Sequence, residues 1–104
     1  MKQIERIMYM ESILDEATEI INDLSDSLEK YQAILPKIKE LADYYQNEWR
    51  NDFEDDEAGK LPKDLKRGVL SEDAVYNLLA LNDEVSEVIE KLNKQKRTIT
   101  IKSL

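Results

Sequence analysis

Carboxylates are the side chains of this sequence whose types and spacing come closest to catalysis. Glu16 and Glu19 are separated by one helical turn, and Glu40 and Asp43 repeat that spacing further along the chain. Carboxylate oxygens bind Mg²⁺, and a bound Mg²⁺ can activate water for attack on a phosphate ester. The two pairs therefore raise the hypothesis of a magnesium-dependent hydrolase.

These acidic pairs are similar to the carboxylate pattern of the all-helical MazG-type nucleotide pyrophosphatases, which hold magnesium between antiparallel helices. In the helical register described below, however, Glu16, Glu19, Glu40 and Asp43 all fall on the outer, solvated face. A bend at Pro36 does not bring Glu19 beside Glu40. We therefore interpret the pairs as surface charge and expect no enzyme activity, with a Mg-dependent, MazG-like nucleotide pyrophosphatase as the alternative.

Other common catalytic and metal-binding patterns are missing from the sequence. The chain has no Cys and no His, which excludes thiolate zinc sites and nucleophiles activated by histidine. The acidic run 52–57 does not fit a calcium loop, because aligning Gly59 with the loop glycine puts Ala58 and Leu65 where ligands are required. We therefore expect no catalytic residue, no bound metal and no cofactor.

The charge balance limits the partners. Fifteen Lys and Arg against 23 Asp and Glu give a net charge of −8, which opposes binding to nucleic acid or to an anionic membrane surface. The first ten residues lack the unbroken apolar run of a secretory signal, and no run approaches the ~20 apolar residues that span a bilayer. These features predict a cytoplasmic protein that binds neither nucleic acid nor membrane.

A seven-residue apolar repeat runs through the first half of the chain and predicts one helix over about residues 3–51. Position g is also mostly apolar, which makes the stripe wider than the seam of a two-stranded coiled coil. Pro36 interrupts the helix without shifting the repeat, which indicates a kink, and a break with a new helix starting at Pro36 is the alternative. Position a holds Ile7, Leu14, Ile21, Leu28, Leu35 and Ala42, and position d holds Met10, Ala17, Leu24, Tyr31, Ile38 and Tyr45.

The repeat ends in a connector, residues 52–70, which leads to a second apolar helix over about residues 72–96. Within the connector, Pro62 and Gly68 are placed to bound one short helical turn, with Gly68 left-handed. Ser71 is the expected N-cap of the last helix. We assign residues 1–97 to a single helical domain. In the tail, 98–104, β-forming residues alternate, which leaves frayed ends and a short intermolecular strand as alternatives.

The lengths of the two helices predict self-association. The last helix, about 38 Å long at 1.5 Å per residue, covers only half of the first. We therefore expect an all-α fold in which a long, kinked N-terminal helix packs against a shorter C-terminal helix and is completed by a homodimer. A fold-back at Pro36 into a three-helix bundle is the alternative to this helical hairpin. The proposed contact residues are Ile7, Met10, Leu14, Ala17, Ile21 and Leu24.

The connector carries the candidate partner-binding residues Lys63, Lys66 and Arg67, a basic patch on an acidic chain. They can bind a phosphate or an acidic partner, or they can pair with the acidic run 52–57 inside the chain. Nearby, Tyr44, Tyr45, Trp49 and Phe53 are expected to pack beneath the connector. A protein partner is therefore possible here, and its identity stays open.

The connector also carries a family resemblance. Its residues resemble those of a family of short bacterial proteins known as domain-of-unknown-function family 4298, over about residues 1–93. The resemblance implies a helical fold and a bacterial cytosolic setting, and it implies no activity, cofactor or catalytic residue. The matching segments are Leu61-Pro62-Lys63-Asp64-Leu65-Lys66-Arg67-Gly68-Val69-Leu70-Ser71-Glu72-Asp73, Asp56-Glu57-Ala58-Gly59, Tyr76-Asn77-Leu78-Leu79, Leu35-Pro36-Lys37-Ile38 and Asp43-Tyr44-Tyr45.

Overall fold

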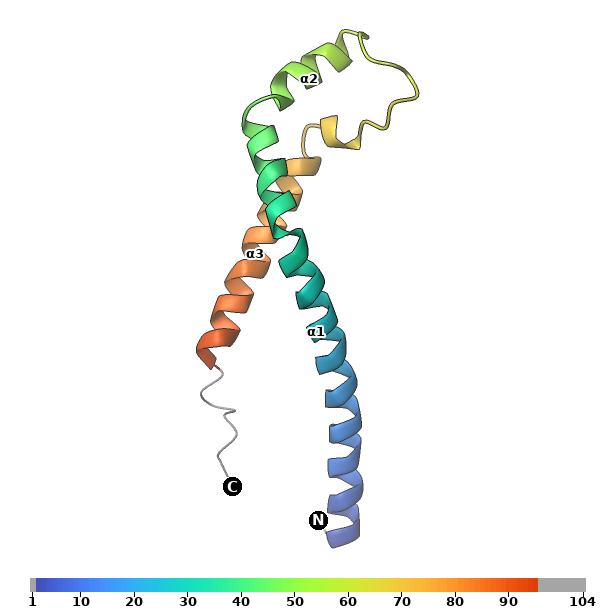
Figure 1. Cartoon of the computed structure of the whole chain (residues 1–104). Coiled ribbons are helices and arrows are strands. Elements are labelled where there is room, and N and C mark those ends of the chain that lie inside the picture. Colours follow the sequence, from blue (N-terminus) through green and yellow to red (C-terminus); the bar gives the residue numbers. More distant parts are fainter. Residues whose placement is uncertain (1, 96–104) are drawn as a thin grey trace. The chain divides into compact units, whose positions relative to one another are not determined.

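The computed structural model describes residues 2–95, all of whose regular elements are helical (Figure 1). In chain order these are α1 (Gln3–Gln46), α2 (Trp49–Glu57), the 3₁₀ helix η1 (Gly68–Leu70) and α3 (Ala74–Gln95). The expected all-α class, with a long N-terminal and a shorter C-terminal helix, is confirmed. The strand suggested for the tail lies outside the described residues.

Helix α1 continues through Pro36 without interruption. A proline inside a helix removes one backbone hydrogen bond, but the bonds on either side remain and the apolar repeat keeps the same register across it. The alternative in which a new helix begins at Pro36 is therefore wrong, and so is a chain that folds back at that residue.

The end of α1 corrects the sequence prediction, because the helix ends at Gln46 and not at residue 51. The Asn47 backbone N–H donates to the carbonyl of Tyr44 (3.1 Å), and the Asn47 side chain donates to the carbonyl of Asp43 (2.6 Å). These bonds satisfy carbonyls that a helix end leaves without partners. The apolar repeat hid this turn, since Trp49 still occupies position a of the same register.

The predicted connector, 52–70, is also shorter than expected, because α2 extends to Glu57. Gly59 ends that helix in a left-handed conformation (φ 73°), and its N–H donates to the carbonyl of Asp56. The next N–H, of Lys60, donates to the carbonyl of Asp55, which completes a Schellman motif. The same two residues form a salt bridge of 3.6 Å between Lys60 Nζ and Asp55 Oδ1.

The start of α3 differs from the prediction in two details. Gly68 does not adopt a left-handed conformation; it begins η1 instead. Ser71 is not the N-cap of the last helix, because its hydroxyl and its N–H both donate back to the carbonyl of Gly68. Helix α3 begins at Ala74, where the Asn77 N–H donates to the Asp73 carbonyl, rather than at residue 72.

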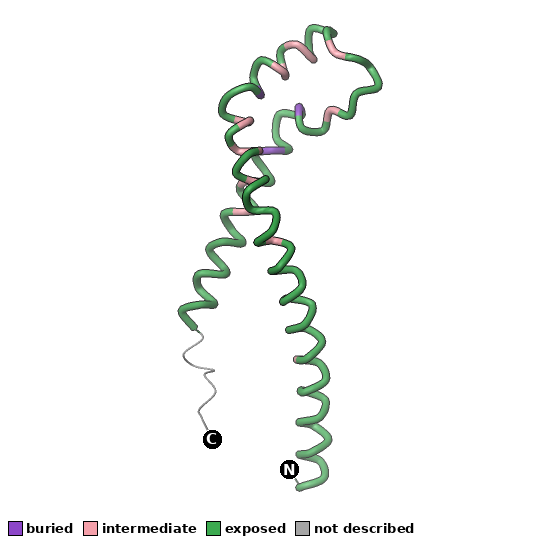
Figure 2. The backbone as a smooth tube through the Cα atoms, viewed as in Figure 1, coloured by how far each residue is buried: buried purple, intermediate pink, exposed green. Residues whose placement is uncertain are grey.

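The chain divides into two compact units, Met1–Lys37 and Ile38–Leu104, which we call the N-terminal and the C-terminal unit. The buried hydrophobic residues among residues 2–95 are Trp49, Leu70 and Val75, and all three belong to the C-terminal unit (Figure 2). Helix α1 contains no buried residue. Among residues 2–95, no helix is long and apolar enough to cross a membrane.

Candidate functional site

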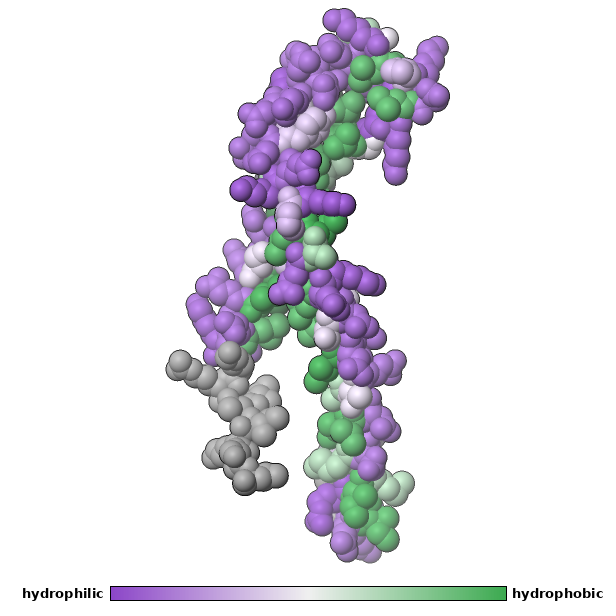
Figure 3. Space-filling view, in the orientation of Figure 1, coloured by the Kyte–Doolittle hydropathy of each residue, from purple (hydrophilic) through white to green (hydrophobic). Residues whose placement is uncertain are grey.

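The N-terminal unit exposes a continuous apolar surface along α1 (Figure 3). Leu14 and Ile21 remain 59% and 62% exposed, and only Ala17 and Tyr31 in residues 2–37 are half-buried. We call this surface the α1 stripe. It comprises the predicted self-association residues Ile7, Met10, Leu14, Ala17, Ile21 and Leu24, together with Ile13 and Ile20 at the neighbouring g positions.

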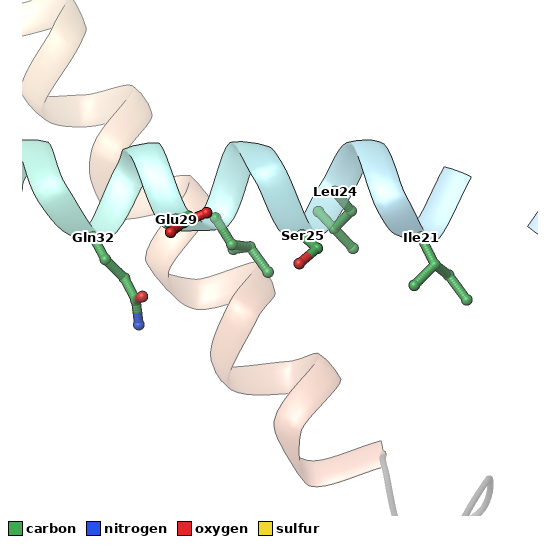
Figure 4. Close-up of a pocket in the computed structure, with 6 residues that line it drawn as sticks. Ile21, Leu24, Ser25, Glu29 and Gln32 are labelled. Atoms are coloured by element: carbon green, nitrogen blue, oxygen red, sulfur yellow. The ribbon is translucent and has the colours of Figure 1, made fainter. Parts of the chain in front are cut away.

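Part of the α1 stripe borders an open groove of about 530 Å³ (Figure 4). Apolar Ile21, Leu24 and Leu28 occupy the a and d positions of its lining. Uncharged Ser25 and Gln32 stand beside them at the e positions, and Glu29 completes the lining. A surface that is apolar in its centre, with few polar groups to orient a small molecule, suits the side chains of another helix better than a substrate.

Charge on the same helix is kept away from the stripe. Residues 11–29 contain seven acidic side chains and no basic one. Six of the seven occupy the outer b, c and f positions, and the seventh, Glu11, lies at an e position. Between Glu11 and Pro36, every e and g position is uncharged. The stripe is therefore an apolar strip with acidic residues on the far side of the helix.

The carboxylate pairs considered for magnesium are solvent-exposed, since Glu16, Glu19, Glu40 and Asp43 are all exposed on α1. Within residues 2–95, no group of three or more Asp, Glu, His or Cys side chains could hold a metal ion. Neither pair is assembled into a metal site in the described part of the chain.

The C-terminal unit is organised around Trp49. Its ring stacks on Phe53, with centroids 5.0 Å apart, and meets the edge of Tyr45 at 5.2 Å. The indole Nε1 donates to the carbonyl of Val69 (2.8 Å), which ties the segment before α3 to α2. Aromatic side chains are large, so their burial contributes strongly to so small a core. The expected aromatic packing beneath the connector is thus confirmed, with Trp49 buried and Phe53 half-buried.

Arg67, one of the three candidate partner-binding residues, is committed to contacts inside the connector. Its Nε donates to both carboxylate oxygens of Asp56 (2.9 and 3.2 Å). Its Nη1 and Nη2 donate to the carbonyls of Lys63 and Pro62 (3.1 and 2.6 Å). The guanidinium therefore fixes the loop to α2, and the pairing with the acidic run that the sequence left open is realised at Asp56.

Lys63 and Lys66 differ from Arg67. Both lysines are exposed, and neither has a salt-bridge partner in the described part of the chain. Leu65, which lies between them, is 45% exposed. The two lysines and Leu65 are therefore exposed residues of the same loop.

A second polar contact, missed at the sequence level, joins α1 to α2. The Tyr44 hydroxyl donates to Asp52 Oδ2 at 2.8 Å. Burial, the hydrogen bond to Asp52 and the nearby negative charges of Asp52 and Glu48 together raise the pKa of Tyr44 to about 12. The spacing of Asp52, Phe53 and Asp56 on one side of a helix is the sequence signal that these carboxylates face inward rather than into water.

A hollow of about 300 Å³ lies beside Arg67. Phe53 and Leu70 supply its apolar lining, and Glu57 and Glu72 add carboxylates at its edge. Arg67 and Asp56 also line the hollow, and their charges already pair with each other in a salt bridge. The hollow is therefore part of the connector's packing.

The fold and surfaces define a small all-helical protein with one long helix and a short connector that Arg67 holds against α2. Residues 7–97 match the model of a family described as a domain of unknown function, DUF4298, so the chain belongs to that family. The expected family resemblance is thereby confirmed. Neither a curated protein nor a solved structure matches the chain.

Proposed function

We propose that the protein is a non-enzymatic helical interaction module that self-associates as a homodimer through the α1 stripe. The observation that carries the proposal is the exposure of this stripe, in which only Ala17 is half-buried. Burying a fully exposed Leu or Ile side chain contributes roughly 1.5–3 kcal/mol, and these residues, each about half exposed, gain part of that stabilisation when a second helix covers them.

The occupant that best fits the stripe is a second copy of the same helix. The seven-residue repeat keeps a and d residues on one side, as knobs-into-holes packing requires. Because the e and g positions between Glu11 and Pro36 are uncharged, two copies can approach without facing like charges across the seam. Their acidic residues stay in water on the outer faces.

The connector offers a second surface, for a different kind of partner. Lys63 and Lys66 project from an acidic molecule, with exposed Leu65 between them. An acidic protein segment is the chemistry that this surface suits, and Arg67 contributes by holding the loop in place.

Light scattering over a range of protein concentrations tests the homodimer. We expect the mass to rise from one chain to two, and Leu24→Asp to prevent that rise, because it places a charge within the apolar seam. Asn22→Asp is the matched control, since it adds the same charge at an exposed b position and should leave the dimer intact. A monomer at every concentration contradicts the proposal, and Mg²⁺-dependent release of pyrophosphate from nucleotides contradicts its non-enzymatic part.

A further inference from the structure

We infer that the two copies pair antiparallel, with Leu14 opposite Ala17 of the partner subunit at the centre of the seam. This inference rests on the self-association proposed above and specifies its geometry. In this register, Met10 lies opposite Ile21 of the partner subunit, and Ile7 lies opposite Leu24 of the partner subunit. The symmetric pairs complete a seam that extends from Ile7 to Leu24 in both chains.

Side-chain size favours this register over a parallel one. Parallel helices in register place each residue opposite its own copy, so Ala17 would face Ala17 of the partner subunit and leave the centre of the seam without large side chains. The antiparallel register instead sets the small Ala17 against the larger Leu14. Alternating large and small residues across facing positions is how helical interfaces fill space.

The apolar residues at position g point to the same orientation. In an antiparallel pair, the g positions of the two helices face each other, so Ile13 and Ile20 gather on one edge of the seam. In a parallel pair, g faces e, and these isoleucines would lie against Thr18 and Ser25 of the other chain. Since Ile13 is 43% exposed and Ile20 58% exposed in the single chain, the antiparallel arrangement buries more apolar surface.

Charge along α1 is complementary only when the copies run in opposite directions. The basic residues Lys2 and Arg6 lie at the start of the chain, and the acidic residues Asp23, Asp26 and Glu29 lie about five to seven turns later. Antiparallel pairing sets each basic end beside the acidic end of the other copy, whereas parallel pairing aligns the acidic segments along their full length. The one favourable parallel contact, Arg6 with Glu11, is an exposed pair of the kind that contributes little.

Spin labels test the orientation directly, because the chain has no cysteine and an introduced cysteine is therefore the only residue that the label modifies. Glu5 and Asp26 both lie at outer f positions, and the antiparallel register places them at the same level. Labels on these two residues are then separated only by the width of the dimer, so a mixture of Glu5→Cys and Asp26→Cys chains should give the shorter intermolecular distance. A dimer made only of labelled Glu5→Cys chains should give a longer distance between its two labels, because the two copies of residue 5 are offset along the helix axis by about 32 Å.

The outcomes separate the two proposals. A short distance for Glu5→Cys alone, or a long one for the mixture, overturns the antiparallel register while leaving self-association in place. Chains that stay monomeric by light scattering overturn the self-association itself.

Charge reversal provides a second readout. Arg6→Glu should weaken the dimer about twofold to fivefold. In the Arg6→Glu chain, a second substitution, Asp23→Lys, should restore the affinity of the dimer if the copies are antiparallel. If Glu11→Lys restores the affinity and Asp23→Lys does not, the antiparallel register is overturned.

Discussion

The two units of this protein use their apolar residues differently. In the C-terminal unit, Trp49, Leu70 and Val75 are buried and polar contacts hold the surrounding turns, although the apolar residues further along α3 stay exposed. In the N-terminal unit, a longer run of apolar side chains is almost entirely exposed. An apolar face becomes a core only when a second element covers it. The contrast therefore lies between the α1 stripe, which has no buried residue, and the connector end of the C-terminal unit, where the buried residues are found.

The largest expected loss of stability comes from a substitution that disrupts the core of the C-terminal unit. Val75→Asp places a charge at a position that is 3% exposed, and we expect the free energy of unfolding of this unit to fall by more than about 3 kcal/mol. Trp49, the single tryptophan, reports the transition by fluorescence in urea. Leu81→Asp is the control on the same helix: since Leu81 is 54% exposed, an equally large loss there would contradict the contrast.

A smaller loss of stability is expected when the contacts of Arg67 that hold the connector to α2 are removed. Arg67→Ala should lower the free energy of unfolding by about 1–2 kcal/mol, because it leaves the Asp56 carboxylate and two loop carbonyls without their donor. Arg67→Lys should restore little of it, since an ammonium group cannot make this fork of bonds. Full stability in Arg67→Lys would show that charge alone holds the loop.

Added salt should strengthen the dimer formed by the N-terminal unit, whereas it weakens an interface held by ion pairs. The outer faces of two copies carry mostly acidic residues, so their repulsion is screened as ionic strength rises. We expect the dimer dissociation constant to fall a few-fold between low salt and about 0.15 M, measured by light scattering or sedimentation. A dissociation constant that rises instead would indicate that cross-chain ion pairs dominate.

A last effect concerns alkaline pH. Tyr44 has a pKa of about 12 in the folded chain against about 10 when unfolded. Its contribution to stability is therefore complete below pH 10 and is lost as pH rises through 12. Tyrosinate absorbance should show a late step for Tyr44, and Tyr44→Phe should remove that step. If Tyr44→Phe leaves the titration curve unchanged, the Tyr44–Asp52 hydrogen bond does not persist in solution.

Local periodicity predicted the helical class, the continuity of α1 through Pro36 and the apolar stripe, because each depends on residues a few positions apart. It failed at the end of α1, where Asn47 turns the chain by hydrogen bonds to Asp43 and Tyr44 while the apolar spacing continues to Trp49. It also treated Asp52 and Asp56 as solvated charge, because their partners Tyr44 and Arg67 lie outside the helical turn that periodicity describes.

The sequence by itself determined that the chain is helical, acidic and without Cys or His, since composition and repeat spacing are properties of the chain alone. The tertiary structure decided which apolar residues are buried and which charged residues are paired. Burial at Trp49, Leu70 and Val75 requires elements that are distant in sequence to meet. The role of Arg67 likewise depends on a loop returning to α2, a geometry that no local pattern encodes.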